Sequence, residues 1–212
     1  YCDFYEKLEI KNAVEIHSNS TGALSPEHRL FSTPHFVYSG YDNIKKEHLL
    51  KFRGKSFELR NTSSISTDDV IDIVKNWKEE TKLVHLESML ITGLPWEPEF
   101  DKEAFWKHFE GTPWNPEKRG PRFKYPSTMK SAHKFDILDC TQHLDIQRDN
   151  DGMLATVLFQ EMYFGLFVWH TAFPDPSETV SESYTCAARP VRRPNYPVRH
   201  REKLWLIGDV DL

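Results

Sequence analysis

Cysteine is scarce in this sequence, and its spacing argues against a disulfide framework. The chain of 212 residues has three cysteines, Cys2, Cys140 and Cys186, which lie far apart and form no CxxC pair. Small secreted domains carry more cysteines at closer spacing. We therefore expect reduced thiols and a cytoplasmic or nuclear protein.

Long apolar runs are also lacking. No stretch approaches the roughly twenty apolar residues of a membrane-spanning helix, so we expect no membrane partner. The composition, 39% hydrophobic and 28% charged, is that of an ordinary globular protein. Fourteen Phe, eight Tyr and six Trp supply bulky side chains for a core.

Signatures of catalysis are missing as well. The sequence has no HExxH, no GxSxG elbow, no phosphate-binding P-loop and no GxGxxG. Cys140 and His143 form a single pair, without the second pair that would complete a zinc site. We expect no enzyme, with no catalytic, metal or cofactor-binding residues and no cofactor.

Basic charge is confined to the C-terminal end. Residues 189–212 hold six basic and three acidic side chains, a net charge of +3. Because the whole chain has a net charge of −5, residues 1–188 carry −8. An acidic body makes nucleic acid an unlikely partner. The basic stretch 189–203 interleaves Arg with Pro and Tyr, which fits RNA, an acidic partner or an import receptor. We favour an extended or disordered end, with Leu204–Ile207 able to dock as a strand.

The stretch Leu144–Phe159 contains QRDNDG, which resembles the start of a calcium-binding loop. With Gly152 at the sixth loop position, Gln147 and Leu158 fall where acidic ligands are required. Strand-like alternation on both sides, with Asn, Asp and Gly between, instead predicts a β-hairpin.

The N-terminal half alternates strand and helix patterns. We predict strands at Ala13–Ser18, Phe36–Tyr38, Ser56–Arg60 and Leu83–Ile91, and helices over Tyr41–Arg53 and from a capping box at Ser66–Asp69. The last two strands begin 27 residues apart, within the 20–29 residues of a leucine-rich repeat. This predicts a short β/α stack of parallel strands.

The C-terminal half changes to a period of two. Before the strands of this half, we predict a helix over Asp101–Phe109. A connector over Thr112–Pro126 follows the helix and ends in a strand at Arg122–Tyr125. We predict an antiparallel meander with strands Phe135–Asp139, Leu144–Arg148, Met153–Phe159 and Tyr163–Trp169. The expected fold is a mixed α/β or α+β domain over 1–170, leucine-rich-repeat-like and then meander, followed by a Pro/Arg-rich segment over 171–212.

Several of these segments together resemble the nematode F-box-associated domain, type 2. The first match is a strand, a Ser/Thr–Asp-Asp helix start, a helix ending in Trp and a second strand, here Phe57–Arg60, Ser66–Asp69, Trp77 and Leu83–Leu86. The second is a D-I-x-R-x-D-G-x-x-A-T hairpin and a strand ending in Val-Trp, here from Asp145 to Thr156 and at Val168–Trp169, with one extra residue before Gly152.

The resemblance implies a substrate-recruiting subunit of an SCF-type ubiquitin ligase. Such proteins bind a Skp1-type adaptor through an F-box, which is absent here: either it lies upstream of Tyr1, or this is a member without one. The expected partner is a protein of unknown identity; the alternative is a stand-alone interaction domain with no link to ubiquitin. Trp96 and Trp114, each next to proline, are candidate partner-binding residues, although burial of each ring in the core is the favoured alternative.

Overall fold

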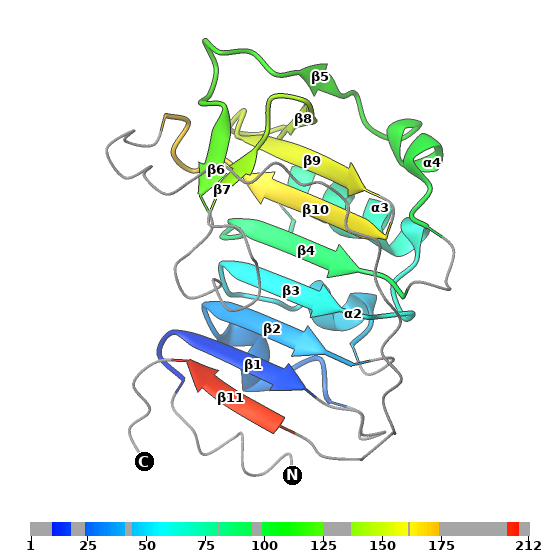
Figure 1. Cartoon of the computed structure of the whole chain (residues 1–212), viewed down its shortest axis with the longest axis vertical. Helices are drawn as coiled ribbons and strands as arrows, with labels where there is room; N and C mark the ends of the chain where they lie inside the picture. Colours follow the sequence, from blue (N-terminus) through cyan, green and yellow to red (C-terminus); the bar gives the residue numbers. More distant parts are fainter. Residues whose placement is uncertain are drawn as a thin grey trace, which may run out of the picture.

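The structure is a computed structural model. It describes residues 10–17, 24–40, 44–79, 81–94, 99–124, 137–160 and 162–173, together with the backbone of Lys203–Ile207. These residues form a nine-stranded mixed sheet with helices on one face and a two-stranded ribbon on the other (Figure 1). The expected mixed α/β class is confirmed.

One half of the sheet is parallel, as predicted. Its strands are β1 (Ala13–His17), β2 (His35–Ser39), β3 (Ser56–Arg60) and β4 (Ser88–Thr92), adjacent in chain order. The predicted start of β4 was wrong. Leu83 adopts a positive φ of 59° and is buried with Leu86 in the turn before the strand, so the apolar pattern there reflects burial rather than extended pairing. The leucine-rich-repeat character of this half is not confirmed.

The helices are shorter than the sequence predicts, apart from one. They are the 3-10 turn η1 (Arg29–Ser32), α2 (Lys46–Leu49), α3 (Thr67–Lys78) and α4 (Lys102–Trp106). Only α3 has its expected length, and it begins with the predicted capping box: Ser66 Oγ accepts from the Asp69 amide at 3.2 Å, and Asp69 accepts from the Ser66 amide at 3.0 Å. Beyond α2, Phe52 remains buried on a non-helical turn.

The other half of the sheet is antiparallel. β8 (Leu144–Gln147), β9 (Leu154–Gln160) and β10 (Tyr163–Val168) form the predicted meander, and β10 joins it to β4. The short strand β5 (Thr112–Pro113) pairs with β8 at the edge. The first of the four expected meander strands was misplaced: β7 (Ile137–Asp139) pairs with β6 (Arg122–Lys124) in the separate ribbon.

The two faces of the sheet carry two hydrophobic clusters. Toward the helices, alternate residues such as Phe36, Phe57 and Phe164 pack with Trp77 of α3 in the main core. On the opposite face the β6–β7 ribbon covers β9 and β10, and Phe123 packs on Phe167 and Trp169 in a smaller cluster that includes Leu90, Cys140 and Leu158. Trp77 and Trp169 are therefore both core residues.

The far edge of the sheet is formed by β11 (Lys203–Ile207), which pairs antiparallel with β1. This agrees with the expectation that Leu204–Ile207 docks as a strand. The remainder of the predicted segment 171–212, apart from 171–173, lies outside the described residues, as does most of the predicted connector beyond Lys124. Within the described chain, no helix has the length and apolar character needed to cross a bilayer.

Candidate functional site

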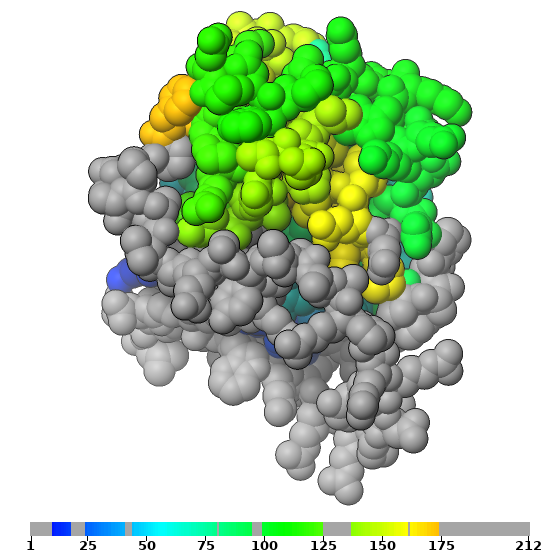
Figure 2. Space-filling view, turned by 45° about the horizontal axis from the view of Figure 1, so that its top comes forward, coloured from blue at the N-terminus to red at the C-terminus, as the bar shows by residue number. Residues whose placement is uncertain are grey.

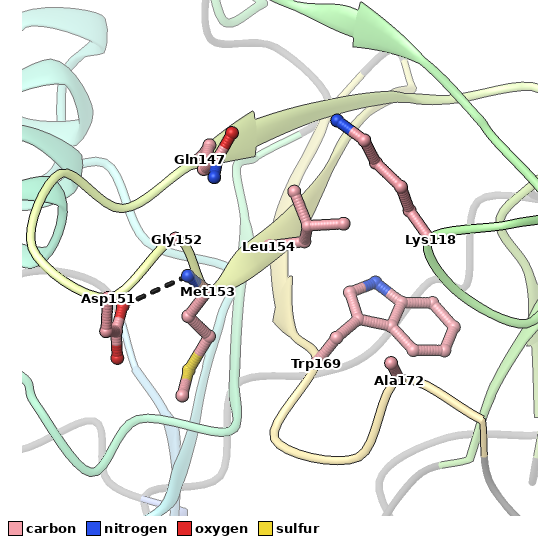
Figure 3. A pocket seen from close by; sticks show the side chains of 8 residues that line it. All are labelled: Lys118, Gln147, Asp151, Gly152, Met153, Leu154, Trp169 and Ala172. Atoms are coloured by element: carbon pink, nitrogen blue, oxygen red, sulfur yellow. Dashed lines mark hydrogen bonds between the residues drawn. The ribbon is translucent and has the colours of Figure 1, made fainter.

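The candidate site is an open cavity of about 330 Å³ beside the β8–β9 hairpin. It is lined by Lys118, Gln147, Asp151, Gly152, Met153, Leu154, Trp169 and Ala172. Figure 3 shows the Lys118 side chain on one side of Leu154 and the turn residues Asp151 and Met153 on the other, with Trp169 below Lys118. In Figure 2 the green 110–124 region and the yellow-green hairpin strands share one surface, with the orange segment at its edge. We call this cavity the hairpin groove.

The hairpin wall of the groove is held by a local ion pair. Arg148, which is 4% exposed, donates from Nε to Asp151 Oδ1 at 2.9 Å and from Nη1 to the Val84 carbonyl at 3.3 Å. The hydrogen bonds from Arg148 hold the pKa of Asp151 well below its usual range. Gly152 has a φ of 72°, the left-handed conformation that the turn requires. The predicted hairpin is confirmed.

The acidic residues of this turn are engaged by cations of the protein itself. Asp151 pairs with Arg148, and Asp149 pairs with Lys78 at the end of α3. The Asp149 amide also donates to the Lys78 carbonyl at 3.0 Å, so the turn is fastened to the helix. These carboxylates stabilise the hairpin and its contact with α3.

A buried ion pair fixes the opposite wall. Arg119, fully buried, donates from Nε and Nη2 to the two carboxylate oxygens of Asp145, each at 2.8 Å. Its remaining donors reach the carbonyls of Gly120 at 2.8 Å and Cys140 at 3.1 Å. Each of the three guanidinium nitrogens thus donates to an oxygen, and a buried charge needs such partners. It attaches the loop that carries Lys118 to strand β8.

The floor of the groove belongs to the same network. Trp169 Nε1 donates to Thr156 Oγ1 at 2.8 Å, and Thr156 Oγ1 donates to Asp145 Oδ1 at 2.7 Å. The Arg119 guanidinium lies 4.6 Å from the centre of the indole ring, a cation–π contact. The indole is therefore held in one orientation, with one edge lining the groove.

The two predicted partner-binding residues have different outcomes. Trp114 is half-buried, and its Nε1 donates to the Arg119 carbonyl at 3.2 Å. Its ring does not line the groove, but it lies on the loop that supplies Lys118. Trp96 lies outside the described residues. The groove-lining residues Lys118, Met153 and Leu154 were missed, because nothing in their local pattern distinguishes them from other loop and strand residues.

Cys140 is buried in the second cluster, and His143 is half-buried, with its amide donating to the Cys140 carbonyl at 3.4 Å. Burial raises the pKa of the Cys140 thiol to about 12 and lowers the pKa of the His143 imidazole. A thiol with so high a pKa is a poor nucleophile and a poor metal ligand at neutral pH. In the described ranges, no group of three or more His, Cys, Asp or Glu side chains is placed to hold a metal ion.

A second cavity, of about 390 Å³, lies where β3 and β4 meet the start of α3. It is lined in part by Thr67, Asp68, Glu99 and Asp101. The capping box already uses the first amides of α3, and the Asp101 amide donates to Thr67 Oγ1 at 2.9 Å. The negative charge of its three acidic side chains, Asp68, Glu99 and Asp101, disfavours an anion there.

No protein-family model, no curated protein and no solved structure matches the chain. The resemblance to the F-box-associated domain therefore stays a prediction. What can be said of function comes from the hairpin groove and its surroundings.

Proposed function

We propose that this protein is a non-catalytic protein-recognition module that binds its partner at the hairpin groove. The proposal is carried by the combination of an apolar floor, Leu154 and Trp169, with a single ammonium group, Lys118, on a loop fixed by the Arg119–Asp145 pair. A surface that is already rigid loses little conformational entropy on binding. Phe173, 57% exposed, directly follows the groove-lining Ala172 in sequence and is a large apolar side chain accessible to a partner.

The chemistry of the groove suits a short peptide segment. Leu154, Met153 and Trp169 would receive one apolar side chain, and Lys118 would attract a carboxylate or a carbonyl oxygen. Asp151 is held by Arg148 and contributes structure more than a free charge. We therefore favour a partner whose recognition segment pairs an apolar residue with an acidic one.

The wider role that we propose is substrate recruitment within an SCF-type ubiquitin ligase. It is supported by the two sequence motifs in the order of the F-box-associated domain. Leucine-rich-repeat character in the parallel half is part of the same proposal. The strand starts Ala13, His35 and Ser56 follow one another at the spacing of such repeats, about 20–29 residues, whereas the step to Ser88 is longer. A Skp1-type adaptor would bind through an F-box upstream of Tyr1. A stand-alone interaction domain is the alternative.

Affinity capture from nematode lysate tests the wider role. The protein, with any residues that precede Tyr1, is compared with a version lacking the F-box. Recovery of the adaptor and a cullin supports ligase membership, and substrates are the proteins retained when the F-box is removed. Partners recovered with neither adaptor nor cullin would favour the stand-alone domain.

Groove variants test the binding site itself. Lys118 and Phe173 are both exposed, so Lys118→Glu with Phe173→Ala should leave folding intact while reducing partner recovery about tenfold or more, as removal of central contacts does. Lys107→Glu with Tyr163→Ala makes the same chemical changes at exposed positions that do not line the groove. Equal recovery by both double variants would place the binding surface elsewhere.

A further inference from the structure

The parallel strands have a polar face on the side away from the helices. Residues that alternate with the core positions of β1, β2 and β3 lie on this side. We call it the polar face, and it holds Glu15, His17, His35, Ser56, Glu58 and Arg60. Strands buried on both faces usually carry apolar residues on both, so this face is chemically unusual.

The polar face carries a buried cluster of charges. Arg60 donates from Nη1 to Glu15 Oε1 at 2.9 Å and from Nε to Glu58 Oε1 at 2.8 Å. The side chains of Glu15 and Glu58 are 8% and 3% exposed. Burial alone would lower the pKa of Arg60, but the two carboxylates outweigh it and raise that pKa. His17 Nε2 also lies 2.9 Å from Glu15 Oε1. With His17 counted as neutral, the formal charges of Glu15, Glu58 and Arg60 sum to −1, and carboxylates this deeply buried favour cationic neighbours.

A second observation on the same face also indicates a polar occupant. His35 and Ser56 are paired residues of β2 and β3. Within the described part of the chain, His35 Nδ1 and Ser56 Oγ are buried atoms with no hydrogen-bond partner. Buried polar atoms in native proteins are nearly always satisfied, so these two predict a group that offers hydrogen bonds over the strands.

Chain connectivity brings one segment to this face. Residues 174–202 connect Phe173, just beyond β10, to Lys203, which pairs with His17 at the end of β1. Four strands separate β10 from β11, a span of about 24 Å at 4.8 Å per strand step. β10 and β11 run in the same direction, since each is antiparallel to the parallel set. The end of β10 and the start of β11 therefore lie at opposite ends of the strands, so the connection must run the length of the strands as well as cross them.

Among the helices and strands that the structure describes, those next to β1–β3 cover one face of the sheet and leave the other open. Helices α2 and α3 lie behind the sheet in Figure 1, whereas the β6–β7 ribbon stands in front of β9 and β10. Of the helices and strands that the structure describes, none lies over β1–β3 on the polar face. The sequence of the connection matches this face: it ends in an arginine-rich stretch with Arg189, Arg192, Arg193, Arg199 and Arg201 and one acid, Glu202.

We propose that the polar face is the docking surface for the chain's own arginine-rich segment, residues 189–202, with guanidinium groups directed at Glu15 and Glu58. Prolines at 190, 194 and 197 favour an extended conformation that needs no ladder hydrogen bonds. Such a segment can cross strands instead of joining them, and its carbonyls and guanidinium groups can satisfy His35 and Ser56. The proposal does not depend on the function assigned to the hairpin groove.

Trypsin cleavage of the full chain gives the first test. Three arginine bonds have no proline after them, those of Arg192, Arg199 and Arg201, and the test follows the first two. Docking predicts that both are cut about tenfold or more slowly than in a free peptide of residues 189–202. Glu15→Gln with Glu58→Gln should remove that protection, whereas Glu103→Gln with Glu110→Gln, at exposed sites, should not. Cleavage of the wild-type chain at the rate of the free peptide would overturn the proposal.

A second variant leaves the polar face unaltered, in case loss of the two carboxylates prevents folding. All five arginines of 189–201 are replaced by Gln, and carbodiimide labelling of Glu15 and Glu58 is quantified by mass spectrometry. Docking predicts low labelling in the wild type and a rise of severalfold in the variant. Labelling that is low in both proteins means that something else covers the face, and labelling that is high in both means that nothing does. Either result contradicts the proposal.

Discussion

The guanidinium of Arg119 and the carboxylate of Asp145 meet in a two-pronged ion pair, with both hydrogen bonds at 2.8 Å and neither side chain more than 3% exposed. The pair joins an irregular loop to a sheet strand 26 residues away in sequence. Removing one partner of this pair should strongly destabilise the fold, because the remaining buried charge has no solvent to replace its partner.

Asp145→Asn should therefore lower the free energy of unfolding by about 3–5 kcal/mol. Urea denaturation followed by Trp fluorescence measures this, and Trp169, in contact with Arg119, should report the local change. Asp149→Asn, in the more exposed pair with Lys78, is the matched control and should cost no more than about 1 kcal/mol. Equal losses in the two variants would contradict the buried network.

Gly152 is the residue of the hairpin turn least able to accept a side chain. Its φ is 72°, and an added Cβ would lie 2.8 Å from Gln147 Nε2. Gly152→Val should destabilise the protein by at least about 1–2 kcal/mol, the cost of a left-handed conformation for a residue with a Cβ. Gly93→Ala is the control, since its Cβ would meet the Met162 carbonyl at an ordinary 3.6 Å.

Thermal melting with and without calcium complements the glycine variants. Asp149 and Asp151 are paired with Lys78 and Arg148, so added calcium should leave the melting temperature unchanged. A rise of several degrees with calcium would contradict the structural role of these carboxylates.

The sequence predicted correctly those helices and turns that are specified by residues close together in the chain. The capping box at Ser66 and the apolar stripe Val70, Ile73, Val74 and Trp77 specify α3 by themselves, and the Asn-Asp-Gly turn specifies the hairpin. The helix predicted over Asp101–Phe109 was too long. Phe109 is buried in the core but lies in a turn beyond the end of α4. Burial alone does not fix the backbone conformation.

Pairing between segments far apart in the sequence was predicted only in part. A period of two identifies a strand but not its neighbour, so Ile137–Asp139 was placed in the meander although it pairs with Arg122–Lys124. The decisive contacts there are Phe123 on Phe167 and Trp169, made across the sheet face. The Arg119–Asp145 pair and the groove that it supports arise in the same way, from residues distant in sequence.

Cys140 should be inert in the folded protein. Burial raises the pKa of its thiol to about 12, so almost no thiolate is present at neutral pH. In a chain with Cys2→Ser and Cys186→Ser, reaction of Cys140 with a disulfide reagent should be at least about a hundredfold slower than in urea, following the fraction of thiolate and exposed thiol. A rate in buffer close to the unfolded rate would show that the second cluster opens readily.

Two half-buried histidines should make the protein less stable in mild acid. Burial is the main cause that lowers the pKa of His35; Glu87 raises that pKa and Lys55 lowers it, both more weakly than burial. Burial likewise lowers the pKa of His143, where Lys102 and Arg119 oppose Asp139 and Asp145.

Because the folded-state pKa of each histidine lies below its ordinary value, the unfolded chain takes up protons first as the pH falls. Between the ordinary value, about 6.5, and the lower folded value, each histidine should reduce the free energy of unfolding by up to about 1.4 kcal/mol per pH unit. Urea denaturation between about pH 7.5 and 5.5 measures this slope. His35→Gln with His143→Gln should flatten it, whereas His85→Gln, at an exposed site, should not. An unchanged slope in the double variant would mean that neither imidazole is kept neutral by burial.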